Sequence, residues 1–232
     1  MTRVEIITRF REENPEITSN VASDITLKSW LIIGNQEIVA KTRMIVASSS
    51  FDIVAGTAAY DLNALLSKFF DIDEYPGGGV SIVDTSGKET RLGKTTKAEI
   101  DNNKSNWRTE SSGTPREYYR RNNFLHLRPV PSSSIVSINV DYAVIANDFN
   151  SDNIEPFNEL THLRPFHYSL VLYLKMRAKA KIGKPEDVAM AMNEYNGYIT
   201  WIEKELGGGK YGNIYFRPKG VTPYRGYRWK YY

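Results

Sequence analysis

Three histidines are the residues of this chain best suited to bind a metal or to carry out general acid–base chemistry. His162 and His167 lie five positions apart, and His126 lies in a predicted strand. Zinc hydrolases place two histidines four positions apart with a glutamate between them, and that spacing is absent here. We therefore interpret all three as surface or hydrogen-bonded structural histidines.

A short acidic run and two glycine clusters are candidates for binding a cation or a phosphate. The run 71–74 (Asp-Ile-Asp-Glu) does not continue as a calcium loop, so we interpret it as an exposed acidic turn. Gly77–Gly79 is not followed by lysine, and Gly207–Lys210 lacks both the upstream glycine and the Ser or Thr of a phosphate loop. Both glycine clusters are predicted to be flexible turns, and we expect no metal and no cofactor.

Nucleophilic catalysis has no support in the sequence. The chain contains no cysteine, which excludes thiolate nucleophiles, disulfides, zinc fingers and iron–sulfur clusters together. The serine clusters 48–50 and 132–134 are expected in loops, and neither forms the Gly-x-Ser-x-Gly elbow of a serine hydrolase. We find no catalytic residues and predict that the protein is not an enzyme.

The last 26 residues, 207–232, carry the strongest functional signal. This arm contains six basic and no acidic residues, for a net charge of +6, while residues 1–206 have a net charge of −3. Eight of the 28 aromatic residues also lie in it, a composition unlike that of an inert polar linker. The predicted partner-binding residues are Tyr211, Tyr215, Phe216, Arg217, Lys219, Tyr224, Arg225, Tyr227, Arg228, Trp229, Lys230, Tyr231 and Tyr232.

The arm has three possible roles. Its aromatic and basic residues can stack on bases and pair with phosphates, as in proteins that bind single-stranded nucleic acid. They can fill pockets of a protein partner, since Tyr, Trp and Arg are enriched at binding hot spots. The arm can also pack on its own domain as an extra strand. At about 3.3 Å per residue, 26 extended residues span about 85 Å, which favours contact with another subunit or protein.

The elements that must position these residues begin with two helices in segment 1–43. The first ends before Pro15, and the second is predicted over 24–42 with Asp24 as its N-cap. Gly34 interrupts the apolar stripe of the second helix. Segment 44–152 follows, with β-branched and aromatic runs separated by turn residues. Its predicted strands are 44–47, 51–54, 80–84, 118–121, 124–128 and 135–143, with a hairpin turn at 121–123.

Alternation in the last predicted strand places Val136, Ile138, Val140, Tyr142 and Val144 on one apolar face. Segment 153–206 then returns to helix. The run 166–182 follows Pro165 and is apolar on nearly every side, which predicts a buried central helix ending at Gly183. Pro185 begins a final amphipathic helix, whose apolar stripe is Val188, Met192, Tyr195, Ile199, Ile202 and Leu206.

The sequence therefore predicts an α+β fold. A helical bundle is built from the N-terminal helices and two long C-terminal helices, with an inserted antiparallel β domain (44–152) and an extended C-terminal arm (207–232). No stretch approaches the roughly 18 apolar residues of a membrane-spanning helix, and residues 1–16 lack the apolar centre of a secretory signal, so we expect a soluble protein.

Several short motifs follow one another in a fixed order along the chain. They are 56–62 (Gly-Thr-Ala-Ala-Tyr-Asp-Leu), Phe69 with Phe70, Trp107, 113–115 (Gly-Thr-Pro) with Tyr118 and Tyr119, 124–131 (Phe-Leu-His-Leu-Arg-Pro-Val-Pro), a strand ending in Asp141-Tyr142, and the apolar helix from Phe166. Their order resembles that of the head-to-tail connector, or adaptor, proteins of tailed bacteriophages, over roughly residues 20–206. The chain departs from the family pattern at Asn63, where the family tends to have proline after Tyr-Asp-Leu.

The resemblance implies a structural virion protein, assembled in the host cytoplasm, at the head–tail junction. It implies a homo-oligomeric ring of about twelve subunits below the portal, closed through heterologous contacts. The helices would form the ring wall, the arm would dock to the portal, and a tail or ring protein would attach downstream. Genomic double-stranded DNA would pass through the lumen without sequence-specific binding. The alternative is a nucleic-acid-binding protein that uses the same arm.

Overall fold

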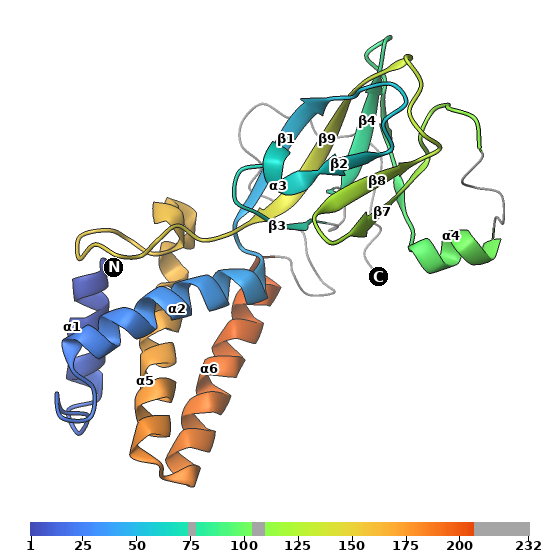
Figure 1. Cartoon of the computed structure of the whole chain (residues 1–232). Helices are drawn as coiled ribbons and strands as arrows, with labels where there is room; N and C mark the ends of the chain where they lie inside the picture. The colour runs from blue at the N-terminus through green and yellow to red at the C-terminus, as the bar shows by residue number, and fades with distance from the viewer. Residues whose placement is uncertain (74–77, 104–109, 207–232) are drawn as a thin grey trace, which may run out of the picture.

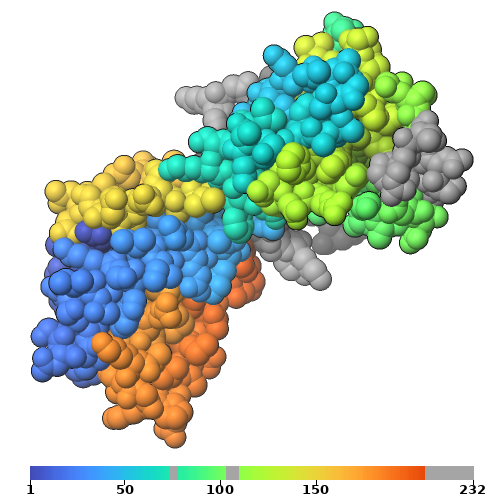
Figure 2. Space-filling model, viewed as in Figure 1, coloured from blue at the N-terminus to red at the C-terminus, as the bar shows by residue number. Residues whose placement is uncertain are grey.

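The computed structural model describes residues 1–73, 78–103 and 110–206, and these ranges form an α+β fold, as predicted. Helices α1, α2, α5 and α6 lie on one side of the molecule, and two β-sheets lie on the other (Figure 1). The strands fall between the two pairs of helices in the sequence. In the space-filling view the helices and the strands form two lobes (Figure 2).

The N-terminal helices are α1 (Arg3–Glu13) and α2 (Asp24–Thr42). A capping box starts α1, in which Thr2 and Glu5 satisfy each other's backbone N–H groups. We predicted Asp24 as the N-cap of α2, and this was wrong. The N-cap is Ser23, whose side chain accepts a hydrogen bond from the Thr26 N–H. Asp24 lies in the first turn and pairs with Arg11, whose Nη2 is 2.9 Å from its Oδ1.

The C-terminal helices are α5 (Tyr168–Ile182) and α6 (Pro185–Glu205), preceded by two 3₁₀ turns, η2 (Phe157–Glu159) and η3 (Thr161–Phe166). Helix α5 is the predicted buried central helix and packs against α1, α2 and α6. It begins two residues later than predicted, because Pro165 lies in η3. Gly183 ends α5 in the left-handed region, at φ 82°, and Pro185 occupies the first turn of α6.

Gly34 is needed where α2 crosses α5. An ideal Cβ at position 34 would lie 2.6 Å from Cδ1 of Tyr173 on α5, closer than non-bonded carbon atoms approach. The Tyr173 hydroxyl donates to Glu37 Oε2 at 3.1 Å, one turn further along α2. The glycine that interrupts the apolar stripe therefore lets the two helices pack closely.

The first sheet contains five strands. They are β1 (Val46–Asp52), β3 (Phe69–Ile72), β4 (Val80–Asp84), β5 (Glu89–Arg91) and β9 (Ile135–Val144). The order is β1-β9-β4-β5, and β3 also pairs with β9. All of these pairs are antiparallel, as predicted.

The second sheet has the order β2-β8-β7-β6. Its strands are β2 (Ala59–Asp61), β6 (Gly93–Lys94), β7 (Glu117–Arg121) and β8 (Phe124–Arg128). The predicted hairpin joins β7 to β8 with Asn122 at φ 54°. The short pair β6–β7 is parallel, an exception to the predicted antiparallel domain.

Two short helices, α3 (Leu62–Leu65) and α4 (Lys97–Asn103), interrupt the strands. Asn63 lies in α3, and its N–H donates to the Asp61 side chain at 3.0 Å. Proline has no N–H to donate, so the departure from the family pattern at this position stabilises the start of α3.

The apolar core is divided into two clusters of buried side chains. One lies among α1, α2, α5 and α6 and includes Phe10, Leu31 and Tyr173. The other lies between the two sheets and includes Leu62, Ile82 and Ile138. Val144, at the end of β9, packs against both clusters.

Two strand predictions were wrong. The predicted strands 44–47 and 51–54 are one strand, β1, which runs through the serines 48–50 that we expected in a loop. In β9, a register shift opposite Val83 and Asp84 buries Ile135 and exposes Val136, so the predicted apolar face holds only from Ile138 onward.

Candidate interaction surfaces

The predicted partner-binding residues all lie in 207–232, outside the described residues. The described residues contain the three histidines, most of the acidic run and exposed surfaces on the helices.

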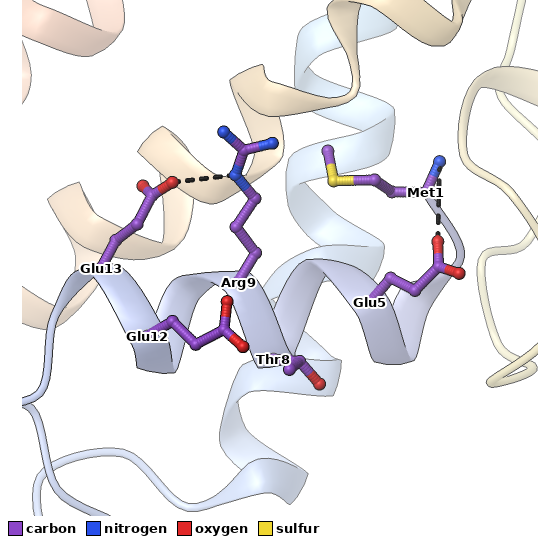
Figure 3. A pocket seen from close by; sticks show the side chains of 6 residues that line it. All are labelled: Met1, Glu5, Thr8, Arg9, Glu12 and Glu13. Carbon is purple, nitrogen blue, oxygen red and sulfur yellow. Dashed lines mark hydrogen bonds and ion pairs between the residues drawn. The ribbon is translucent and has the colours of Figure 1, made fainter.

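A shallow hollow runs along α1 (Figure 3). Its charged groups are paired: Arg9 Nε donates to Glu13 Oε1 at 2.8 Å, and the Tyr168 hydroxyl donates to Glu13 Oε2 at 2.8 Å. Burial opposes ionisation of Glu13, but these bonds hold its pKa below the ordinary value. The hollow is lined by Met1, Glu5, Thr8, Arg9, Glu12 and Glu13.

The network at this hollow also perturbs Tyr168 on α5. Burial and the hydrogen bond to Glu13 raise the pKa of Tyr168 to about 12. The Arg9 guanidinium lies 4.7 Å from the centre of the Tyr168 ring, a cation–π contact. These contacts attach α1 to α5, and we interpret the hollow as structural.

His167 is fully buried at the start of α5, consistent with a structural histidine. Its Nδ1 accepts a hydrogen bond from the Met1 ammonium group at 2.7 Å. Burial and the nearby positive charge of that ammonium lower the pKa of His167 to about 4. His126, in β8, stacks on Tyr119 with ring centres 4.6 Å apart.

The buried His167 should make the protein less stable in mild acid. An unfolded histidine binds a proton below pH 6.5, whereas the folded His167 binds one only near pH 4. The contribution of His167 to the free energy of unfolding is therefore fully present above pH 6.5 and is lost as the pH falls toward 4. We expect a loss of about 1.4 kcal/mol per pH unit in this window from His167. Urea unfolding at pH 7 and pH 5 measures the loss of stability between these two pH values.

His167→Gln should reduce this loss by about 2 kcal/mol. The control His162→Gln, at an exposed position, should leave the loss unchanged. Equal losses in the two variants would contradict the assignment to His167.

The acidic run at residue 71 is not the exposed turn we predicted. Asp71 lies in β3 and pairs with Arg43, at 2.6 Å, and with Arg120. Asp73 is buried, and its N–H donates to the Asp141 carbonyl at 2.8 Å. Glu74 lies outside the described residues. The described ranges contain no group of three His, Asp or Glu residues placed to hold a metal ion.

The outer face of α2 carries no charge and exposes isoleucines. Ile25 is 82% exposed and Ile33 43% exposed, and Ser29 and Gln36 lie exposed on the same side. Ile32 lies partly exposed beside them. Helix α2 crosses the face of the molecule seen in Figures 1 and 2. We call these residues (Ile25, Ser29, Ile32, Ile33 and Gln36) the α2 stripe.

The charged residues of α2 are paired within the subunit and flank the stripe. Lys28 Nζ lies 2.7 Å from Asp152 Oδ2, and Lys41 Nζ lies 2.8 Å from Glu37 Oε1. Asp24, the remaining charged residue, pairs with Arg11. A row of exposed isoleucines on an uncharged helix face is a candidate interface with another protein. The α2 stripe was not predicted from the sequence, although isoleucines at 25, 32 and 33, opposite Leu27 and Leu31, indicate a second apolar side.

Helix α6 also exposes large apolar side chains. Met190 is 71% exposed and Trp201 40% exposed, and since they are three turns apart they share one side of the helix. The Trp201 ring packs edge-on against Phe166, with centres 5.4 Å apart. This second apolar face lies on a different helix from the α2 stripe.

Comparison with protein families decides the identity of the chain. Residues 1–207 match the family described as SU10 adaptor protein. The chain belongs to the SU10 adaptor family. Among the curated proteins, none matches it. The predicted resemblance to phage head-to-tail adaptors is confirmed, and it extends to the first twenty residues, which we had left out.

As an SU10 adaptor, the protein has a structural role at the phage head–tail junction. The match ends at residue 207, so it supports the function of the helices and sheets and does not cover the arm. No helix in the described ranges combines the length and the apolarity needed to span a membrane.

Proposed function

We propose that this SU10 adaptor assembles into a ring of about twelve copies below the portal vertex of the capsid. The helices form the ring wall, and the sheets face outward or toward the tail. A downstream tail or ring protein attaches below. The family membership supports a position at the head–tail junction. The α2 stripe is the observation that supports assembly into a ring.

The α2 stripe suits a contact between neighbouring subunits. A closed ring needs a heterologous interface, in which one face of each subunit meets a different face of the next. The stripe offers an uncharged surface with two exposed isoleucines, and α6 offers Met190 and Trp201 on a second face. Interface cores are depleted of charge, as the α2 stripe is, and enriched in Met and aromatic residues, which α6 supplies.

The arm is proposed to dock to the portal. Its aromatic residues fill pockets between portal subunits, and its basic residues, including Arg217, Arg225 and Arg228, pair with acidic groups there. The net charge of −3 on residues 1–206 lets genomic DNA pass through the lumen without adhering. In this proposal the protein has no catalytic role.

Nucleic-acid binding through the arm is the second candidate function. Interleaved Tyr, Trp and Arg residues are typical of single-strand binding. The two functions differ in their response to salt, because phosphate contacts release counterions and lose affinity steeply as salt rises. A salt-dependent affinity for DNA that exceeds the affinity for the portal would favour this second function.

A charge in the α2 stripe should prevent ring assembly. Ile33→Asp places a carboxylate in an interface that excludes water, and we expect subunit association to weaken at least about 100-fold. The 43% exposed Ile33 side chain points away from the core, so the subunit should stay folded. Native mass spectrometry measures the subunit number. Val54→Asp, at a 62% exposed loop position, is the control and should assemble normally; rings of normal size with Ile33→Asp would exclude the α2 stripe from the contact.

A further inference from the structure

Strand β1 has an open edge. It pairs with β9 on one side, where the Val144 N–H donates to the Ile45 carbonyl and the Ile53 N–H donates to the Val136 carbonyl, both at 2.9 Å. In an antiparallel pair, alternate residues direct their backbone groups to the same side. The backbone N–H and C=O groups of the residues between therefore point away from β9. They belong to Val46, Ser48, Ser50 and Asp52, and no described residue bonds to them.

This edge lacks the features that normally prevent strand addition. Natural proteins protect sheet edges with short strands, proline, bulges or charged side chains, lysine above all. The other edge strands are shorter: β3 has four residues, β2 and β5 have three, and β6 has two. Strand β1 has seven residues, no proline, no lysine or arginine, and an unbroken register with β9. An extended segment can therefore pair along its whole length.

The outer face of β1 is polar and its inner face is largely apolar. This difference determines which sequence can pair with β1 as an added strand. On the outer face, Ser48 donates to the Asp141 side chain, and Asp52 is exposed. On the inner face, Ala47 and Phe51 pack against the core between the sheets, and the Phe51 ring lies 5.7 Å from that of Tyr60. A matching strand has basic residues on one side and aromatic residues on the other.

The end of the chain has this alternation. In 227–232, Tyr227, Trp229 and Tyr231 occupy one set of alternate positions, and Arg228 and Lys230 lie between them. Figure 1 shows α6 ending beside the C-terminal end of α2, from which the chain enters β1. The twenty residues 207–226 span up to about 66 Å when extended, so the last residues have ample length to reach the edge.

We propose that, before the subunit meets its partner, residues 227–232 of the same chain pair with the open edge of β1 as an added strand. The aromatic residues lie beside Phe51, and the basic residues lie beside Asp52 and Asp141. The edge is thereby covered and cannot pair with other copies. The portal would then compete with β1 for the arm; that competition rests on the proposed function, whereas the pairing itself does not.

Ser50→Pro in the full-length chain tests the pairing. The Ser50 N–H points away from β9, so proline removes no bond of the sheet, while it removes an edge donor and obstructs an added strand. Ser50→Thr keeps the N–H and is the matched control. A third chain replaces Tyr227, Trp229 and Tyr231 with serine and leaves β1 unchanged. Amide hydrogen exchange at Ser48 and Asp52, measured by NMR, reports whether the edge is covered.

We expect exchange at Ser48 and Asp52 to be at least about tenfold slower in the wild type and in Ser50→Thr than in Ser50→Pro or the triple-serine chain. Fast exchange in all four chains would overturn the proposal. So would slow exchange that persists in the triple-serine chain, since another segment or a second copy would then cover the edge. Affinity for purified portal protein is measured in parallel: tighter binding by Ser50→Pro supports the competition, and absence of portal binding in every chain counts against the proposed function alone.

Discussion

Gly34→Ala should lower the free energy of unfolding by about 1 kcal/mol net, because a methyl group at this position separates α2 from α5. An ideal Cβ would lie 2.6 Å from Cδ1 and 2.9 Å from Cε1 of Tyr173. The Tyr173 ring is fully buried and held by Glu37, so it has no room to withdraw. Overpacking of this kind costs about 1–3 kcal/mol, more than the roughly 1 kcal/mol that alanine gains in helix propensity. Urea unfolding measures the difference.

Gly197→Ala is the matched control for this prediction. Gly197 lies inside α6, and a Cβ there would meet nothing within 4 Å. Alanine should therefore stabilise the subunit by up to about 1 kcal/mol through helix propensity alone. The two substitutions make the same chemical change in two helices and should have opposite signs. Stabilisation by both would show that α2 and α5 do not pack as closely as the structure has them.

Gly34 also illustrates what sequence reasoning can and cannot determine. The bounds of α2 follow from its apolar spacing and polar start, and the structure reproduces 24–42. Helix periodicity reports which side of one helix is buried, however, and says nothing about how near the next helix lies. In the sequence, Gly34 only interrupts the apolar stripe. Its role in the close packing of α2 against α5 follows from the position of Tyr173 in the structure.

Serines 48–50 show a similar limit in the strands. Three consecutive serines have the composition of a loop, which divided β1 into two predicted strands. In the fold, Ser49 faces the sheet interior between Ala47 and Phe51, and pairing with β9 stabilises the strand regardless of local propensity. Strand β4, with its β-branched residues, was predicted with correct bounds.

The candidate sites were predictable only in part. The order of short motifs was sufficient to indicate the adaptor family, and the family match confirms it. The burial of His167 and the ion pairs of Asp71 depend on residues more than 25 positions away in the sequence, which no local pattern reports. The α2 stripe was not predicted, because Leu27 and Leu31 define one apolar side of the helix and the isoleucines lie on the other side.

Removal of residues 207–232 should abolish incorporation into the phage particle while leaving the subunit folded. The arm carries a charge of +6 and eight aromatic residues, and it is the proposed contact with the portal. Both apolar clusters of the core lie within residues 1–206, so the truncated chain keeps them. The measurement is complementation of a phage that lacks the protein, with the truncated chain quantified in purified particles by mass spectrometry.

A second chain separates the charge of the arm from its aromatic groups. Replacing Tyr215, Phe216 and Trp229 with serine keeps the full charge, and we expect it to reduce incorporation nearly as far as truncation does, because buried aromatic side chains dominate binding hot spots. Circular dichroism and thermal unfolding provide the control for folding. Normal incorporation of the truncated chain would remove the arm from the portal contact, and loss of folding on truncation would show that the fold itself requires the arm.

The position of the protein in the intact particle tests the central claim most directly. Cryo-electron microscopy of the head–tail junction, with the fold described above fitted into the density, gives both the place and the number of copies. We predict a closed ring of about twelve copies directly below the portal, with α2 at the contact between neighbouring subunits. A protein found elsewhere in the particle, or at the junction as isolated copies with α2 facing solvent, would contradict this account.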